Sequence, residues 1–176
     1  MIFTASIIHG AFFIDLEPRE DHRGFFARSW CQKEFEEHGL NPGAVQINVG
    51  FSGVKGTVRG MHYQAAPYEE VKVARCTMGA IYDVIIDLRP GSTTYKRWDA
   101  VELTADNRRM LYVPEGCAHG YQTLTDNAEM YYLTSRFYVA EHARGVRYDD
   151  PSFHVEWPLP VARISDGDLA WPDYAR

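Results

Sequence analysis

The sequence predicts an all-β fold, a sandwich or a barrel, from three observations. Short apolar segments bounded by Gly, Pro, Asn and Asp recur along most of the 176 residues, which is the pattern of many short strands. One segment alone, residues 29–38, has the spacing of an amphipathic helix, and Gly39 and then Pro42 end it. The hydrophobic fraction of 45% and the charged fraction of 24% are ordinary for a globular protein.

The expected strands follow one another with short turns between them. An apolar strand at residues 12–16 is expected to be exposed. The other strands are placed at residues 48–52, 57–64, 71–78, 80–88, 98–103, 110–113, 120–124 and 129–138. We expect one domain over residues 1–176, because no repeat, linker or charge block divides the chain.

The strand at residues 80–88 has two unlike faces. Side chains alternate across a strand, so the segment presents an apolar face and a face that mixes apolar with acidic residues. The first holds Tyr82, Val84, Ile86 and Leu88, and the second holds Ile81, Asp83, Ile85 and Asp87. A mixed face of this kind suits the wet interior of a barrel.

Charge and composition exclude several classes of partner. The net charge of −6 argues against a broad basic face for nucleic acid. No apolar run reaches the ~20 residues that span a bilayer, and residues 1–14 lack the features of a signal peptide. The three cysteines have no metal-binding spacing and are expected to be buried free thiols. We therefore expect a cytoplasmic protein with no membrane or nucleic-acid partner.

Two segments centred on histidine carry the strongest chemical signal. His62 lies late in an expected strand, in residues 59–64 (RGMHYQ), and His119 follows another strand, in residues 114–120 (PEGCAHG). A hydrogen-bonded structural histidine would account for either one alone. Together the segments resemble the two motifs of the cupins, with Glu69 or Glu70 and then Gly79 completing the first. This resemblance implies a double-stranded β-helix (jelly-roll) barrel with short peripheral helices.

A metal-dependent cupin oxygenase or isomerase is the competing class. Metal-binding cupins usually supply two histidines one residue apart plus a glutamate, and this chain has Gln64 where the second histidine stands. An amide is a poor ligand for a transition metal beside imidazole, so the usual three-nitrogen site cannot be built. His119 with Glu69 or Glu70 is the alternative ligand set. We expect no metal and no other cofactor.

Further motifs occur in an order that resembles one family of metal-free cupins. Residues 21–26 (DHRGFF), 58–64 (VRGMHYQ), 83–92 (DVIIDLRPGS) and 113–120 (VPEGCAHG) are similar to motifs of the dTDP-4-dehydrorhamnose 3,5-epimerase family. Later matches lie at residues 149–151, 156–158, 165–168 and 171–172, so the resemblance covers nearly the whole chain. It implies a homodimer that epimerises a nucleotide-linked 4-keto-6-deoxy sugar at C3, at C5 or at both.

Such a reaction gives physical roles to four residues. Protons at C3 and C5 are acidic because each carbanion delocalises into the C4 carbonyl, and a histidine is a usable base near neutrality. The resemblance implies that His62 is the base, that Asp168 orients it, and that Tyr132 is the acid on the opposite ring face. Lys72 is the candidate for stabilising the enolate oxygen. Strand alternation supports an inward Tyr132, on one face with Thr134, Arg136 and Tyr138.

Each of these roles has a structural alternative. Asp168 stands at N3 of a capping box begun by Ser165 and could serve only as a helix cap. Asp166 is the rival carboxylate. Lys72 could be a surface residue, and Tyr132 could be a packed barrel tyrosine.

The ligand contacts implied by the resemblance are spread along the chain. Arg23 and Arg59 suit a diphosphate, because guanidinium groups make paired hydrogen bonds to phosphate oxygens. Arg59 and His62 have opposite parity in their strand, so a shared pocket requires a bulge or twist at Gly60. Asp83 is expected to brace Lys72 or Arg59 by charge pairing. The remaining contacts are Phe26, Gln46, Asn48, His119 and Tyr138.

Three departures from the family concern the nucleotide. Arg28 and Arg144 stand where relatives often have Glu, and Ile47 stands where Asp is usual. Arginine has no acceptor for the thymine N3–H and favours acceptor-rich edges such as that of guanine. These two arginines are therefore expected to contact the nucleotide, with dTDP, GDP and CDP all open. A sugar-nucleotide 3,4-ketoisomerase and a non-catalytic binding protein are further alternatives on this fold.

Overall fold

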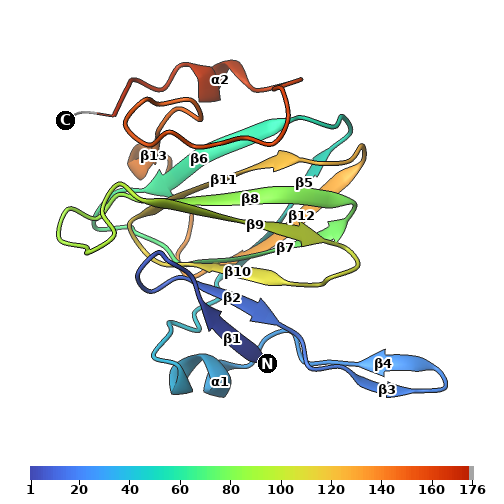
Figure 1. Cartoon of the computed structure of the whole chain (residues 1–176). Coiled ribbons are helices and arrows are strands. Elements are labelled where there is room, and N and C mark those ends of the chain that lie inside the picture. The colour runs from blue at the N-terminus through green and yellow to red at the C-terminus, as the bar shows by residue number, and fades with distance from the viewer. Residues whose placement is uncertain (175–176) are drawn as a thin grey trace.

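The computed structural model describes residues 1–174 and places two antiparallel β-sheets face to face (Figure 1). One sheet has the strand order β1-β2-β10-β7-β12-β5, and the other has the order β13-β6-β11-β8-β9. Strands β3 and β4 form a separate hairpin that projects away from the barrel (Figure 1). The predicted all-β barrel of the double-stranded β-helix type is confirmed.

The strands are β1 (Ile2–Ala5), β2 (Phe12–Asp15), β3 (Arg19–Asp21), β4 (Gly24–Phe26), β5 (Gln46–Ser52), β6 (Val58–Gln64), β7 (Lys72–Met78), β8 (Ala80–Asp87), β9 (Trp98–Thr104), β10 (Met110–Val113), β11 (Cys117–Thr123), β12 (Ala128–Thr134) and β13 (Ala143–Gly145). The helices are α1 (Gln32–Glu37), η1 (Ala140–His142) and α2 (Asp166–Leu169). Strand β10 occupies the predicted residues, and most of the other predicted strands agree with the structure to within a few residues.

Two predictions about strands are wrong. The strand expected at residues 129–138 ends at Thr134. Ser135 still donates its N–H to the carbonyl of Val71 at 3.0 Å, but the N–H of Val71 donates to the Ser135 hydroxyl at 2.8 Å, so the backbone ladder stops there. The strand expected to be exposed at residues 12–16 is instead flanked by β1 and β10, and its Ile14 is fully buried. Strands β1, β3, β4 and β13 were not predicted from the sequence.

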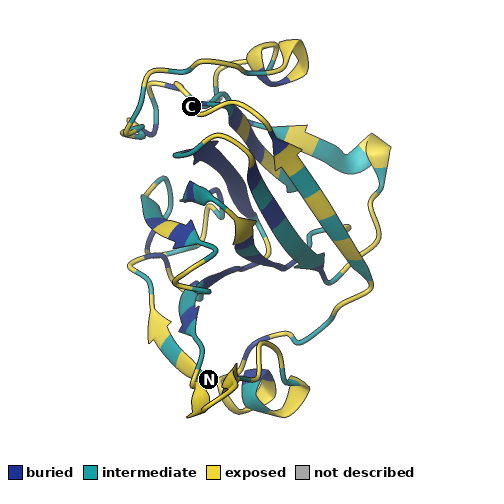
Figure 2. Ribbon diagram, turned by 90° about the vertical axis from the view of Figure 1, so that its right-hand side faces the viewer, coloured by how far each residue is buried: buried dark blue, intermediate teal, exposed yellow. Residues whose placement is uncertain are grey.

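Three apolar clusters hold the layers together. The first fills the barrel interior and includes Ala74 and Met130 from one sheet with Ile81 and Ile85 from the other, so the strand at 80–88 faces inward as predicted. The second packs α1, through Phe35, onto the outer face of the six-stranded sheet. The third packs the C-terminal segment onto the outer face of the five-stranded sheet. Figure 2 shows the resulting contrast between buried barrel strands and exposed peripheral segments.

The three cysteines differ in how far they are buried. Cys76 and Cys117 are buried free thiols as predicted, and burial raises the pKa of Cys117 to about 12. Cys31 is only half-buried, so the prediction of burial is wrong for this residue. No helix within residues 1–174 is long and apolar enough to cross a membrane.

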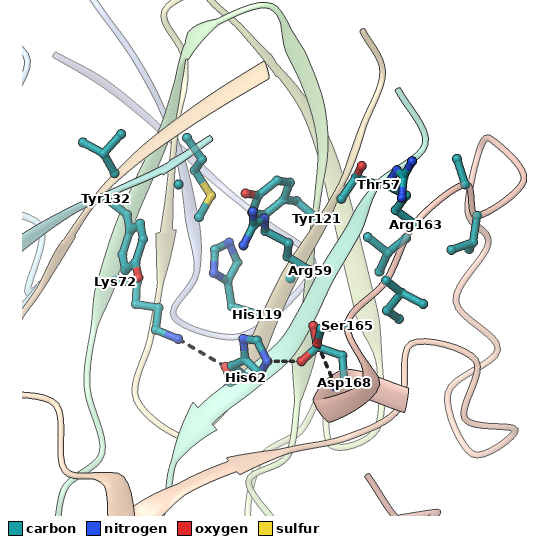
Figure 3. A pocket seen from close by; sticks show the side chains of 18 residues that line it. Thr57, Arg59, His62, Lys72, His119, Tyr121, Tyr132, Arg163, Ser165 and Asp168 are labelled. Carbon is teal, nitrogen blue, oxygen red and sulfur yellow. Dashed lines mark hydrogen bonds and ion pairs between the residues drawn. The ribbon is translucent and has the colours of Figure 1, made fainter. Parts of the chain in front are cut away.

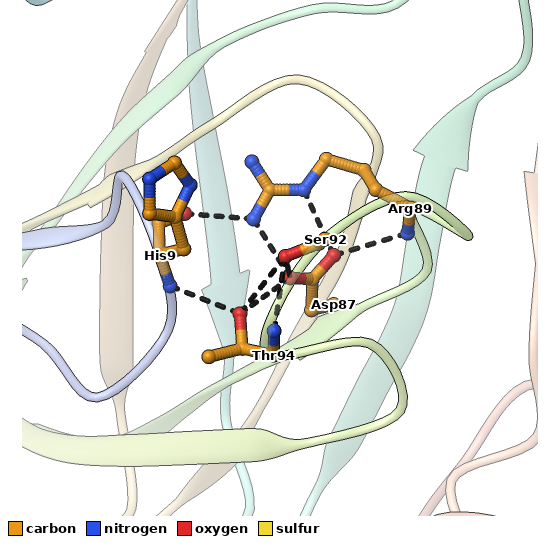
Figure 4. A network of polar contacts seen from close by, with 5 residues as sticks. All are labelled: His9, Asp87, Arg89, Ser92 and Thr94. Carbon is orange, nitrogen blue, oxygen red and sulfur yellow. Dashed lines mark hydrogen bonds and ion pairs between the residues drawn. The ribbon is translucent and has the colours of Figure 1, made fainter.

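A buried polar network fixes the loop after β8 (Figure 4). The carboxylate of Asp87, which is inaccessible to solvent, accepts hydrogen bonds from Arg89 Nε at 2.8 Å, Ser92 Oγ at 2.5 Å and Thr94 Oγ1 at 2.6 Å. Arg89 in turn donates to the carbonyl of His9 at 2.7 Å, which ties the loop to the N-terminal segment. Burial opposes the charge of Asp87, but these donors outweigh it and lower its pKa from 3.8 to about 2.

We expect Asp87→Asn to lower the free energy of unfolding by about 3 kcal/mol, because removing one partner of a buried ion pair strands the other. The lowered pKa means that the stabilisation is complete above about pH 4 and is lost as the pH falls toward about 2. The difference from wild type should therefore narrow in acid. Asp21→Asn is the control, since Asp21 pairs with Arg23 at the same spacing on the surface. Urea unfolding at several pH values measures the free energy of unfolding of both variants. An equal loss of stability in Asp87→Asn and Asp21→Asn would contradict the prediction.

Candidate active site

Two adjoining cavities lie at one end of the barrel. The larger, the barrel cavity, has a volume of about 860 Å³ and is lined by residues of β5, β6, β7, β11, β12 and the segment leading into α2 (Figure 3). The smaller, the side cavity, has a volume of about 360 Å³ and is lined by β5, β6, β12 and residues 138–144. His62, Lys72 and Tyr132 line both cavities. Three of the four residues predicted to be catalytic therefore stand where the cavities meet.

The imidazole of His62 is bonded to a carboxylate from the far end of the chain. His62 Nε2 and Asp168 Oδ1 lie 2.5 Å apart, and Asp168 Oδ2 accepts a hydrogen bond from the backbone N–H of Gly60 at 3.3 Å. Burial opposes the charge of Asp168, but its contacts with His62 and Gly60 hold its pKa below the usual value. An ionised Asp168 accepts the Nε2–H, which leaves Nδ1 as the basic nitrogen toward the cavity (Figure 3).

Helix α2 explains why Asp168 rather than Asp166 reaches the histidine. Ser165 is the N-cap, and its hydroxyl accepts a hydrogen bond from the backbone N–H of Asp168 at 3.0 Å. This cap holds the Asp168 side chain against β6, whereas Asp166 is exposed. The capping geometry and the contact with His62 thus coexist, because one uses the backbone and the other the side chain.

A bulge at Gly60 brings Arg59 and His62 into the same cavity. His119 of β11 pairs with His62, but Tyr121, two residues on, pairs with Arg59, three residues back. The extra residue in β6 reverses the alternation of side chains, as the parity of the two residues requires. Gly60 has a φ of 123°, and a side-chain carbon there would meet Gly120 Cα at 2.6 Å. Only glycine fits at this position.

Tyr132 faces the cavity from the opposite sheet. It lies on β12 of the six-stranded sheet, while His62 lies on β6 of the five-stranded sheet. Burial, with a contribution from the carboxylate of Glu70, raises the pKa of the Tyr132 phenol, and the cation of Arg59 opposes them. The phenol is therefore protonated near neutrality and is able to donate a proton.

Lys72 is a buried cation with a fixed position. Its Nζ donates to the carbonyl of His62 at 3.2 Å and pairs with Glu70 Oε1 at 3.3 Å. The expectation that Asp83 braces Lys72 or Arg59 is wrong. Asp83 Oδ1 instead lies 2.7 Å from Nε2 of His119, and both residues are buried. Because Lys72 is buried and has these two partners, it is not a surface residue.

The other predicted ligand contacts separate into two groups. Arg59 and His119 line the barrel cavity, and Tyr138 and Arg144 line the side cavity together with Gln46 and Asn48. The three remaining residues lie elsewhere. Arg23 and Phe26 belong to the exposed β3–β4 hairpin, and Arg28 pairs with Glu34 at 3.1 Å beside it. Within one chain, these three do not line either cavity.

Several cavity residues escaped the sequence analysis, and three of them have large side chains suited to ligand contact. Arg163 and Tyr121 line the barrel cavity, and Trp171 lines the side cavity. Trp171 packs so closely on Gly145 that a side-chain carbon there would meet its ring at 2.3 Å. The Trp-Pro motif at 171–172 marked this segment but did not indicate a cavity position. Arg163 carried no signal, since it belongs to no motif.

The possible metal ligands do not converge. Within residues 1–174, no three side chains of His, Cys, Asp or Glu are grouped to hold a metal ion. The two cavity histidines, His62 and His119, each have their own carboxylate partner. Gln64, at the position of the missing ligand, is engaged with backbone instead, since its Oε1 accepts from Val139 N–H at 2.7 Å and its Nε2 donates to the carbonyl of Phe137 at 3.2 Å. The donor set does not fit a cupin metal site.

The fold is that of a cupin-type protein, and the site gathers acid and base groups in one cavity. A base held in one tautomer and a neutral phenol face each other across a cavity beside a fixed cation, which suits proton transfer at carbon next to a carbonyl. A family model described as dTDP-4-dehydrorhamnose 3,5-epimerase matches residues 5–176. The chain belongs to this family of isomerases.

Individual relatives agree with this assignment. The dTDP-4-dehydrorhamnose 3,5-epimerase of Shigella flexneri is 44% identical over 150 residues, which cover 85% of this chain and 82% of that protein. The crystal structure of the Bacillus anthracis enzyme with TDP and PPi bound has a TM-score of 0.94 at 37% identity, and the match covers 98% of this chain and 99% of that one. The Legionella pneumophila enzyme in complex with dTDP-4-keto-L-rhamnose has a TM-score of 0.88 at 31% identity, with 99% of each chain covered.

We expect Asp168→Asn to lower turnover of a dTDP-4-keto-6-deoxy sugar at least ~10²-fold, because a neutral amide no longer fixes the imidazole tautomer. The backbone N–H that bonds to Ser165 is unchanged, so the fold should persist. Asp166→Asn is the matched control, with the same change of charge two residues away, and should keep nearly full activity. Steady-state rates of both variants test this, and a similar loss in the two would contradict the role of Asp168.

Proposed function

We propose that this protein epimerises a dTDP-linked 4-keto-6-deoxy sugar by moving protons between carbon and two side chains on opposite walls of the barrel cavity. One observation carries the proposal: His62 on one sheet and Tyr132 on the other line the same cavity, beside Lys72. A proton removed from one ring face and returned to the other inverts the carbon.

The proposed steps need no external oxidant or reductant. His62 Nδ1 takes the proton from C3 or C5. The electron pair of that C–H bond forms a double bond to C4, and the π pair of the C4 carbonyl moves onto its oxygen. The Lys72 ammonium stabilises the resulting enolate. The carbonyl then re-forms as the carbon takes a proton from the Tyr132 hydroxyl on the other face. Proton exchange with solvent returns the imidazolium and the tyrosinate to their starting states.

Two arginines of the barrel cavity support a diphosphate ligand. Arg59 Nε donates to Ser52 Oγ at 3.0 Å and its Nη2 donates to the carbonyl of Phe51 at 2.9 Å, so the guanidinium is held on β5. Arg163 lines the same cavity. Guanidinium groups at a cavity wall suit phosphate oxygens. We infer that Arg59 and Arg163 bind the diphosphate.

The side cavity is the proposed site of the nucleoside. Gln46 Oε1 accepts a hydrogen bond from the backbone N–H of Tyr138 at 2.7 Å. This contact ties the segment that carries Tyr138 to strand β5, and both residues line the side cavity. The TDP and dTDP-sugar complexes of the relatives support a thymine nucleotide here. Within one chain, Arg28 forms an ion pair with Glu34, whereas Arg144 lines the side cavity. Of the two arginines that replace a family glutamate, Arg144 is therefore the one placed to contact the nucleotide base. GDP and CDP sugars are therefore the alternatives to test.

Solvent deuterium exchange tests the function directly. With a dTDP-4-keto-6-deoxy sugar in D₂O, the wild type should exchange and invert C3, C5 or both, and GDP- and CDP-linked sugars should react more slowly. His62→Ala should lose at least ~10²-fold in exchange and inversion together. Tyr132→Phe should still exchange at carbon while net inversion falls, because only the acid is removed. No exchange in the wild type, or near-normal inversion in His62→Ala, would refute the proposal.

We also propose that two copies of the chain form a dimer in which the β3–β4 hairpin of each reaches the cavity of the other. A two-stranded hairpin alone is marginally stable in water, and this one exposes 71% of Phe26. The edge strand β5 presents a row of exposed apolar side chains, namely Ile47, Val49 and Phe51. An apolar edge strand of this kind needs a covering partner.

We expect light scattering to give the mass of a dimer at micromolar concentration. Ile47→Arg should shift the protein toward monomer, because it places a charge in the apolar row on β5. Ile7→Arg is the control, since Ile7 is 63% exposed but lies outside β5. A wild-type monomer with full activity would contradict the proposed assembly.

A further inference from the structure

Glu70 is a buried acid beside the proposed catalytic cation. It precedes β7, and its side chain is only 9% exposed. Oε1 pairs with Lys72 Nζ at 3.3 Å, and Oε2 accepts a hydrogen bond from Gln64 Nε2 at 3.0 Å. The adjacent Glu69 lines a different cavity, with Arg89 and Glu115. Two neighbouring glutamates therefore have different surroundings.

Gln64 holds the carboxylate of Glu70 in place. The Gln64 side chain is buried, and besides Glu70 its Nε2 contacts the carbonyls of Tyr68 and Phe137. Its Oε1 accepts from Val139 N–H. These contacts fix one carboxylate oxygen of Glu70 from strand β6, so the other oxygen is directed at Lys72.

We propose that Glu70 is the positioning residue of this site: its carboxylate fixes the Lys72 ammonium where the two cavities meet and sets the charge next to the Tyr132 phenol. This inference rests on the proposed function, because it concerns the roles of Lys72 and Tyr132 in that reaction. Glu70 itself is not proposed to exchange a proton with the sugar.

Among the acidic residues near Tyr132, Glu70 is the one whose charge acts on the phenol. The ionisable groups that line the cavities with Tyr132 come from β6, β7, β11, α2 and the peripheral loops; they are Arg59, His62, Tyr63, Lys72, His119, Tyr121, Arg163, Asp168, Tyr138 and Arg144. Of the nearby acids, Asp168 and Asp83 each lie against a histidine. Glu70 is the carboxylate that, after burial, raises the pKa of Tyr132, and Arg59 opposes it.

The sign of the effect follows from the charge. A neighbouring anion disfavours a tyrosinate, so Glu70 keeps Tyr132 protonated to higher pH. Without this anion, Tyr132 ionises at lower pH and its proton is no longer available for the sugar carbon. Inversion should therefore fail at lower pH. Glu70 also lines the side cavity that is proposed for the nucleoside, so nucleotide binding is measured separately and inversion is followed at saturating substrate.

The test compares Glu70→Gln with Glu69→Gln, which removes the same charge one residue away. In pH profiles of net inversion, the alkaline limb of Glu70→Gln should move down by about one unit, the size of effect expected from a single nearby charge. Glu69→Gln should keep the wild-type limb. Glu70→Asp retains the charge on a shorter side chain and should keep that limb with a lower maximal rate. In calorimetry, dTDP should bind Glu69→Gln as well as the wild type, because Glu69 lines a different cavity. The same measurement on the Glu70 variants separates a loss of affinity from a shift of the alkaline limb.

Several results would overturn the role of Glu70. One is a wild-type alkaline limb in Glu70→Gln, and another is an equal shift in Glu69→Gln. An alkaline limb that moves down in Glu70→Asp, which keeps the charge, would also overturn it. This comparison with the wild type decides the matter if Glu70→Gln fails to bind dTDP. The wild type separates the two proposals: absence of deuterium exchange there defeats the proposed function, whereas exchange with unshifted variants defeats only the role of Glu70.

Discussion

The bulge at Gly60 is the constraint on which the rest of the site depends. In a regular strand Arg59 and His62 would face opposite sides, and the barrel cavity would lose one of them. The extra residue turns both into the cavity, and the close approach of β6 to β11 restricts positions 60 and 120 to glycine. The same bulge offers the Gly60 N–H to Asp168, so it also helps to hold the partner of the imidazole.

Around this bulge, the charged groups of the barrel are arranged as pairs. His62 lies against Asp168, His119 against Asp83, and Lys72 against Glu70. Each pair combines opposite or complementary charges in a place where an isolated charge would be costly. The pairs keep each donor and acceptor in one orientation through contacts between side chains. A site built in this way presents a fixed pattern of charge to a sugar nucleotide.

Much of the fold and of the site was predictable from local sequence. Alternation and turn residues indicated most of the barrel strands, and the Ser165–Asp168 spacing indicated the cap of α2. The errors have a common cause. Strand β12 ends early because the Ser135 hydroxyl accepts the N–H of Val71, and Asp83 meets His119 rather than Lys72. Both depend on which strands become neighbours, and local patterns carry no information about that.

Motifs and side-chain types are local properties, so they were enough to indicate the family, the all-β class and the residues proposed to carry the chemistry. The tertiary structure decided which of them meet. His62 and Asp168 are 106 residues apart in the chain and lie in contact only because α2 packs back onto β6. Glu70, which the sequence did not distinguish from Glu69, acquires its position from Gln64 and Lys72. Burial and pairing across strands are properties of the packed barrel. Burial opposes the charge of Asp168 but pairing with His62 lowers its pKa, and burial raises the pKa of Tyr132.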